Sequence, residues 1–266
     1  MMMPRFGSAS PDGSRRARAL PWARLAAALA AALVTAAPVH AQSQGDGFLF
    51  RTPIGSFALR GGLALPGTGG DVFSFIRDTL TVGRSAFNGM TLGADLAFRL
   101  GPRFDVAFSA DYADASTGSE FRNWTDQNEQ PITQTTTFRR VPLSASIKAY
   151  LRPRGQSIGT LAWMPEKYAP FIGVGGGATW YRFQQKGDFV DYRTFDVFPD
   201  ELVSSGWAPT AHGLVGLDVS LSPRFAFTTQ GKYTLGKAKV AGQDFQGFDR
   251  IDLSGFAATA GFYVRF

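Results

Sequence analysis

The chain has 266 residues, of which 24 are Phe, 18% are charged and none is Cys. The lack of Cys excludes a disulfide framework, a thiolate metal site and a cysteine nucleophile. Many aromatic and few charged residues exclude disorder for most of the chain. The net charge of +6 is uneven, because five of the 27 bases but only one of the 21 acids precede Gln42, which leaves 22 bases and 20 acids beyond it. This near balance argues against a nucleic-acid partner.

The first 41 residues have the pattern of a secretory signal peptide. A basic stretch at 15–24 precedes an apolar run of 15 residues at 25–39, and the segment ends on the small residue Ala41. The run is shorter than the roughly 20 residues of a membrane-spanning helix, so a retained anchor is the weaker alternative. We therefore predict cleavage between Ala41 and Gln42, leaving 42–266 as the mature domain.

Beyond Gln42, apolar and polar residues alternate in eight segments. Side chains of a strand point to opposite faces in turn, so each segment predicts a strand with one apolar face and one polar or small-residue face. The segments are 56–65, 89–100, 104–115, 141–151, 169–183, 208–221, 225–235 and 251–266.

The connections between these segments alternate in length. LGPRF at 100–104 and LSPRF at 221–225 are near copies that predict tight turns, whereas 66–88, 116–137, 184–207 and 236–250 are long and polar. An even number of strands with tight turns at one end and long loops at the other predicts an all-β fold, an eight-stranded antiparallel up-and-down transmembrane β-barrel with both chain ends on the turn side.

The connection at 152–168 departs from the tight-turn rule. It contains Leu161, Trp163 and Met164, which suit a position at the bilayer interface. The alternative is an apolar loop folded against the rim of the barrel.

The polar face of the predicted strands carries four acids and five bases. In a membrane barrel this face lines the lumen, where unpaired ions would cost several kcal/mol each, so we expect a network of ion pairs. In a soluble barrel the same residues would face water, and the charge balance does not separate the two arrangements. The expected network consists of Arg60, Asp95, Arg99, Asp105, Asp111, Lys148, Asp218, Lys232 and Arg265.

The C-terminal segment favours the membrane arrangement, and here the chain resembles a known family. Together with the leader and the eight segments, the ending GFYVRF at 261–266 is similar to the small bacterial outer-membrane β-barrel proteins of the OmpA-type and OmpW-type group. In that family such an ending is the signal read by the barrel-assembly machinery, and Phe262, Val264 and Phe266 match it. The resemblance also implies a monomer in the bacterial outer membrane, in contact with lipid and lipopolysaccharide, with periplasmic N- and C-termini.

Catalytic, cofactor and metal sites are not predicted. After cleavage His212 is the single remaining His, and no Ser stands two positions beyond it. The loop acids Asp188, Asp191, Asp196 and Asp200 lack the spacing of a calcium motif. We therefore expect a protein that is not an enzyme, although a Ser-His-acid set could still assemble from separate strands.

The narrow bore of an eight-stranded barrel predicts a lumen filled by side chains. The expected role is then structural or interaction-based, exerted through the long external loops, whose aromatic residues are typical binding anchors. One alternative is a narrow conduit or binding site for small hydrophobic molecules. A second, weaker alternative is a lipid-A-modifying enzyme.

Overall fold

The computed structural model describes residues 47–159, 161–191, 194, 196–239 and 250–266, so the predicted signal peptide and its cleavage site lie outside the described residues. No helix in these ranges is both long and apolar enough to cross a membrane. The elements are β1 (Leu49–Phe50), β2 (Gly55–Pro66), α2 (Asp71–Thr79), η1 (Arg84–Phe87), β3 (Gly89–Arg99), β4 (Phe104–Thr125), β5 (Pro131–Tyr150), β6 (Gly155–Ile158), β7 (Ala162–Pro165), β8 (Tyr168–Val190), β9 (Val197–Ser220), β10 (Phe225–Lys239), β11 (Arg250–Asp252) and β12 (Gly255–Arg265).

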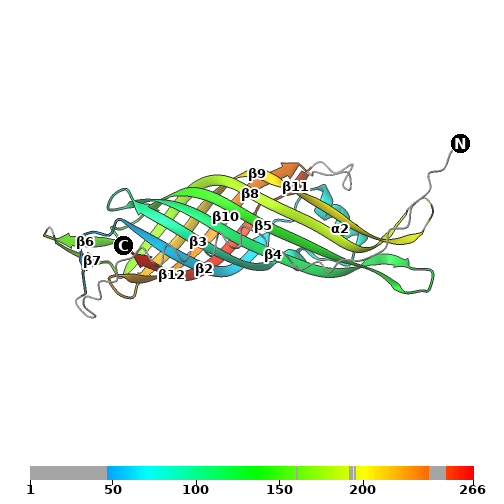
Figure 1. Ribbon diagram of the computed structural model, residues 1–266, viewed down its shortest axis with the longest axis horizontal. Helices are drawn as coiled ribbons and strands as arrows, with labels where there is room; N and C mark the ends of the chain where they lie inside the picture. The colour runs from blue at the N-terminus through cyan, green and yellow to red at the C-terminus, as the bar shows by residue number, and fades with distance from the viewer. Residues whose placement is uncertain (1–46, 160, 192–193, 195, 240–249) are drawn as a thin grey trace, which may run out of the picture. The chain divides into compact units, whose positions relative to one another are not determined.

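Eight of the described strands form a closed antiparallel ring (Figure 1). The ring runs β2, β3, β4, β5, β8, β9, β10 and β12 in chain order, and it closes because β12 pairs with β2 from Gly255↔Pro66 to Arg265↔Ser56. β10 pairs with both β9 and β12, so the sheet has no break at that point. The prediction of an eight-stranded antiparallel up-and-down barrel is confirmed.

The apolar face of the ring points outward. Phe104, Leu143 and Phe262 are 51%, 45% and 61% exposed, whereas Arg60 and Asp105 on the opposite face are 4% and 1% exposed. A closed ring satisfies its own backbone hydrogen bonds, and a continuous apolar exterior suits hydrocarbon rather than water. The soluble arrangement, with the apolar face inside, is therefore wrong.

Four of the spanning strands are much longer than the alternation predicted. The segments 116–137 and 184–207 were expected to be loops, but β4 runs to Thr125, β5 begins at Pro131, β8 runs to Val190 and β9 begins at Val197. Roughly 9 to 11 residues suffice to cross the bilayer, and β9 has 24. The loop prediction was wrong because these extensions are polar on the face that would meet lipid, so no apolar alternation marks them.

The connection 66–88 was expected to be a polar loop and instead contains α2 and η1. In α2, Val72, Phe73 and Ile76 are buried on one face, and the helix lies at the end of the barrel away from the C-terminus (Figure 1). This spacing places the three side chains on one side of a helix, where they pack over the barrel mouth.

At the turn end, the connection 152–168 forms a small sheet of its own. β6 and β7 make a hairpin, and β7 also pairs with β1 through Leu49↔Trp163 and Phe50↔Ala162. Trp163 is 1% exposed, so the interface position expected for it is wrong, whereas Leu161 and Met164 are exposed. The alternative of a segment folded against the barrel rim describes Trp163 better.

The last predicted strand, 251–266, is divided into β11 and β12. The break falls at Leu253 and Ser254, where Leu253 enters the apolar cluster of the mouth. The Ser254 hydroxyl donates to the Gly236 carbonyl at 3.2 Å and so ties the break to β10.

Candidate functional site

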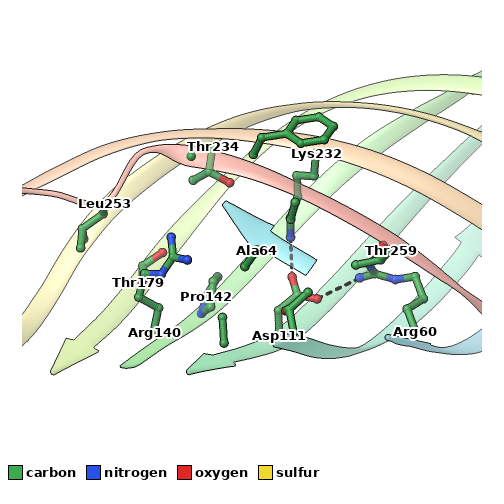
Figure 2. Close-up of a pocket in the computed structure, with 15 residues that line it drawn as sticks. Arg60, Ala64, Asp111, Arg140, Pro142, Thr179, Lys232, Thr234, Leu253 and Thr259 are labelled. Carbon is green, nitrogen blue, oxygen red and sulfur yellow. Dashed lines mark hydrogen bonds and ion pairs between the residues drawn. The ribbon is translucent and has the colours of Figure 1, made fainter. Parts of the chain in front are cut away.

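The lumen holds a central ion network built on Arg60. The Arg60 guanidinium donates two hydrogen bonds to Asp95, at 2.8 and 2.7 Å, and one to Asp111 at 3.0 Å. Lys232 contacts the other oxygen of Asp111 (Figure 2). A two-bond Arg–carboxylate pair is the strong form of this interaction, and every charge in the set is nearly inaccessible to solvent.

Gly93 makes this network possible. It lies directly between Arg60 on β2 and Asp111 on β4 in the strand register. A Cβ atom at position 93 would overlap the Asp111 carboxylate and contact the Arg60 guanidinium. The bare backbone therefore lets Arg60 reach across β3, an effect that sequence alternation alone does not reveal.

Two further polar groups extend the central layer. Lys148 lies 3.7 Å from Asp95 and 5.1 Å from the centre of the Phe171 ring. The hydroxyl of Ser146 is hydrogen-bonded to Nε2 of His212 at 2.8 Å. Among the described residues no carboxylate is hydrogen-bonded to His212, so this Ser–His pair lacks the acid that completes a catalytic triad.

A second polar layer lies nearer the turn end. Asp218 accepts hydrogen bonds from the hydroxyls of Tyr150 and Tyr263, at 3.0 and 3.1 Å. Arg265 donates to the Tyr263 oxygen at 3.0 Å. Asp105 forms an ion pair with Arg154 at 2.6 Å, which brings a base from the 152–168 connection into the lumen.

Trp163 closes the turn end of the lumen. Its ring lies 5.9 Å from the Arg99 guanidinium and 5.4 Å from that of Arg265, both in cation–π geometry. Gly155 lets the ring approach, because a Cβ atom there would overlap the Trp163 indole. The small sheet β1–β7–β6 thus acts as a cap whose central side chain fills the barrel end.

The opposite end is closed by apolar packing. Phe73 of α2 meets Phe87, Phe138 and Phe183 edge-on, with ring centres 5.1, 5.5 and 5.7 Å apart. The mouth cluster, as we name it, is buried and consists of Val72, Phe73, Ile76, Leu80, Val82, Phe87, Phe138, Tyr181, Phe183, Ala208, Ala238, Ile251 and Leu253.

Between the central network and the mouth cluster lies a cavity of about 50 Å³. Arg140 of β5 and Thr179 of β8 line it on one side, with Asp111 and Lys232 opposite (Figure 2). Arg140 lies beyond the segment that the alternation identified, so it was absent from the expected network. Its inward position could have been predicted by continuing the strand backwards, because Phe138, Arg140 and Pro142 are spaced two residues apart and share one face.

The nine residues of the expected network all lie on the inner face of the ring. Eight are less than 9% exposed and Arg99 is part-buried. Five of them form the central network: Arg60, Asp95, Asp111, Lys148 and Lys232. Asp105 instead forms an ion pair with Arg154, which was not among the nine.

The residues of the expected assembly signal lie on the outer face of the last strand. Phe262 and Phe266 are 61% and 52% exposed. The backbone of Phe266 exchanges hydrogen bonds with Gly55, at 3.1 and 3.0 Å, and its ring lies where a Gly55 side chain would be. The aromatic ending therefore takes part in the seam between the first and last barrel strands.

The loop acids do not form a site. Asp188 and Asp200 belong to β8 and β9, and Asp191 and Asp196 flank the turn between them. Among the described residues no group of three or more His, Cys, Asp or Glu could hold a metal ion.

Comparisons with known proteins return outer-membrane proteins among solved structures. No protein-family model and no curated protein matches the chain. The outer membrane protein OprG from Pseudomonas aeruginosa is 14% identical, with 82% of this chain and 99% of that chain covered and a TM-score of 0.45. Neisserial surface protein A is 11% identical (84% and 100% covered, TM-score 0.41), and Ail, the attachment invasion locus protein of Yersinia pestis, is 12% identical (80% and 99% covered, TM-score 0.38).

The assignment to a class of protein rests on the features of the fold and not on these comparisons. A ring without free edges pairs the backbone of its spanning strands, its spanning exterior is apolar, and ion pairs such as Arg60–Asp95 lie on its inner face. The chain is an integral β-barrel protein of the outer-membrane type.

Proposed function

We propose that the protein acts at the cell surface through a rigid sheet that extends the barrel wall. This sheet, which we name the projection, comprises 116–125, 131–137, 184–190 and 197–205 of β4, β5, β8 and β9. The pairs Thr117↔Thr136 and Gln185↔Leu202 belong to it. The β4–β5 and β8–β9 ladders run on from the barrel wall into it, with one register shift between Glu120 and Thr125, and this pairing is the observation that carries the proposal.

The reach of the projection follows from the position of two tryptophans. Trp180 and Trp207 are paired across β8 and β9 and point outward, as aromatic residues do at a membrane surface. Beyond Trp207, β9 continues to Val197, about ten residues at roughly 3.3 Å each. The sheet therefore extends about 30 Å past this pair.

The surface of the projection suits a partner in water. Glu120, Lys186 and Glu201 are exposed along it, and the aromatic side chains of Trp124 and Phe198, near the two hairpin ends, are 37% and 42% exposed. Exposed aromatic residues on a polar, pre-organised backbone are efficient binding anchors, because little conformational freedom is lost on binding.

Side chains fill the lumen at three levels, which supports a barrel that does not conduct ions or solutes. These three closures are the cap around Trp163, the central network around Arg60 and the mouth cluster around Phe73. The narrow conduit is thereby disfavoured, and the Ser146–His212 pair, buried within these closures, offers little support for lipid-A modification. In this proposal the turns and the chain ends face the periplasm and the monomer is bathed by lipid and lipopolysaccharide.

Point variants on the projection test the interaction role. Cells displaying Trp124→Ala/Phe198→Ala are compared with cells displaying Phe50→Ala/Ile54→Ala, a control pair of exposed apolar residues at the turn end. The probe is an array of immobilised glycans and extracellular-matrix proteins. We expect binding by the wild type and the control and its loss in the projection variant; wild-type cells that bind nothing, or equal binding by all three, would contradict the proposal.

Conductance across a planar bilayer tests the closed lumen. Purified wild-type protein is expected to give no steady channels. Steady channels of high conductance would show that the three closures open in lipid and would favour the conduit.

A further inference from the structure

Arg140 is a part-buried base that has no charged partner among the described residues. Its side chain points into the lumen and its Nε atom is inaccessible to solvent and makes no hydrogen bond. Within the described part of the chain, its guanidinium makes no ion pair or hydrogen bond, and it lies over the Phe138 ring, whose centre is 5.1 Å away. A guanidinium that is partly shielded from water and has no acid beside it is destabilised relative to a paired one, and a bound anion would relieve this.

The acids near the cavity are already engaged. Both oxygens of Asp111 are taken, one by Arg60 and one by Lys232. Asp252, beyond the cavity, makes no ion pair or hydrogen bond with Arg140, and one of its oxygens accepts from the backbone N–H of Ser254 at 2.9 Å. The positive charge of Arg140 therefore has no paired carboxylate, whereas that of Arg60 has two.

The described lumen as a whole carries an excess of bases. The nine residues of the expected network include five bases and four acids, and Arg140 and Arg154 raise the bases to seven. Arg99 and Arg265 donate to backbone carbonyls of the turns, which leaves Arg140 as the base whose charge is least compensated in the described residues.

The cavity beside Arg140 has the size and lining of a small-anion site. Its volume of about 50 Å³ is several times the roughly 10 to 15 Å³ that one water requires. Cations line it through Arg140, Arg60 and Lys232, and hydroxyl groups line it through Thr179 and Thr234. The rest of the lining is mostly apolar, and its one carboxylate, Asp111, already pairs with Arg60 and Lys232. Thr179 shares a hydrogen bond with Thr210 at 3.2 Å, and either hydroxyl can be the donor.

We propose that this cavity binds a small monovalent anion, of the size of a halide or nitrate, held by the Arg140 guanidinium. The anion supplies the negative charge that the surrounding side chains do not, and the closures above and below retain it. Binding at this site is independent of any partner of the projection.

Bromide locates the site directly. The full-length protein is folded and crystallised in sodium bromide, and anomalous scattering is measured at the bromine absorption edge. We expect an anomalous peak in the cavity, within hydrogen-bonding reach of Arg140. Solvent density without an anomalous peak would show that water fills the cavity and would overturn the proposal.

Adjacent residues provide a matched pair of variants. Arg140→Gln removes the inward charge, whereas Arg139→Gln removes an outward charge that pairs with Asp114 at the exposed surface. The peak is expected to disappear in Arg140→Gln and to persist in Arg139→Gln. Persistence in both variants would overturn the role of Arg140. If Arg140→Gln does not fold, Arg140→Met, which also removes the charge but keeps a long side chain, replaces it.

The midpoint of thermal unfolding tests anion binding at the same site in solution. At constant ionic strength, replacing gluconate by bromide or nitrate is expected to raise the midpoint of wild type and Arg139→Gln by several degrees, because an anion that binds only the folded state stabilises it. The midpoint of Arg140→Gln is expected to be independent of the anion. Equal midpoints in gluconate and bromide for the wild type would contradict binding.

Discussion

The centre and the mouth of the barrel are both closed, but by different forces. At the centre, Arg60, Asp95 and Asp111 are held by directed ion pairs, whereas at the mouth Phe73 packs among other aromatic rings. A buried ion pair contributes little net stability yet costs much when one partner is lost, while apolar burial contributes in proportion to area. The centre therefore fixes which strands face one another, and the mouth provides stabilisation around a less regular loop.

Removal of one central acid is expected to have the largest effect. Asp111→Ala leaves Lys232 buried without its acid and removes one of the two acids of Arg60, which should lower the free energy of unfolding by about 3 to 5 kcal/mol. Urea unfolding in detergent micelles, followed by tryptophan fluorescence, measures it. The double variant Asp111→Leu/Lys232→Met should recover much of the loss, and a loss below about 1 kcal/mol in Asp111→Ala would show that the network is not truly buried.

The mouth should respond locally to loss of an aromatic ring. Phe73→Ala is expected to cost about 3 kcal/mol in the packing of α2, because it leaves a void among Phe87, Phe138 and Phe183. Hydrogen exchange should accelerate in α2 with little change in the barrel strands. Phe75→Ala, in the same helix but 46% exposed, is the control, and equal exchange in the two variants would contradict the importance of the buried face.

A methyl group at Gly93 tests the geometry of the centre without removing a charge. Gly93→Ala should cost about 1 to 3 kcal/mol, since its Cβ atom overlaps the Asp111 carboxylate. Gly61→Ala on the neighbouring strand places its Cβ atom 3.4 Å from Leu92 and should be nearly neutral. Unfolding midpoints that fall equally in both variants would point to a general strand effect instead.

The smallest effect is expected outside the lumen. The Arg139–Asp114 pair spans 3.3 Å with both side chains more than a third exposed, so Arg139→Gln should change the free energy of unfolding by less than about 1 kcal/mol. A loss as large as that of Asp111→Ala would remove the distinction between inner and outer charges.

The spanning part of the fold could be predicted from the sequence because lipid imposes a strict period. Leu59, Leu63 and Phe262 had to face hydrocarbon, so their alternation marked the strands, whereas the outward direction of the apolar face was inferred from the C-terminal segment. Outside the bilayer this constraint ends. The strand extensions to Thr125 and Val190 carry mostly polar residues on their outer face and therefore show no apolar period.

The parts that were missed depend on contacts between distant segments. Arg154 and Trp163 enter the lumen from a connection whose own pattern suggested only an apolar loop. Arg140 precedes the segment where the apolar period begins, and Ser146 meets His212 across β8. Such partners follow from strand register, which a single sequence does not specify.

The seam between β2 and β12 has a consequence for folding. Arg60 binds Asp95, 35 residues away, but also Thr259, 199 residues away, at 2.9 Å. Contacts of such separation form late, since the intervening chain must first be ordered. Until then β2 and β12 are open edges able to pair with other chains, so the unfolded polypeptide needs protection from aggregation until the two meet.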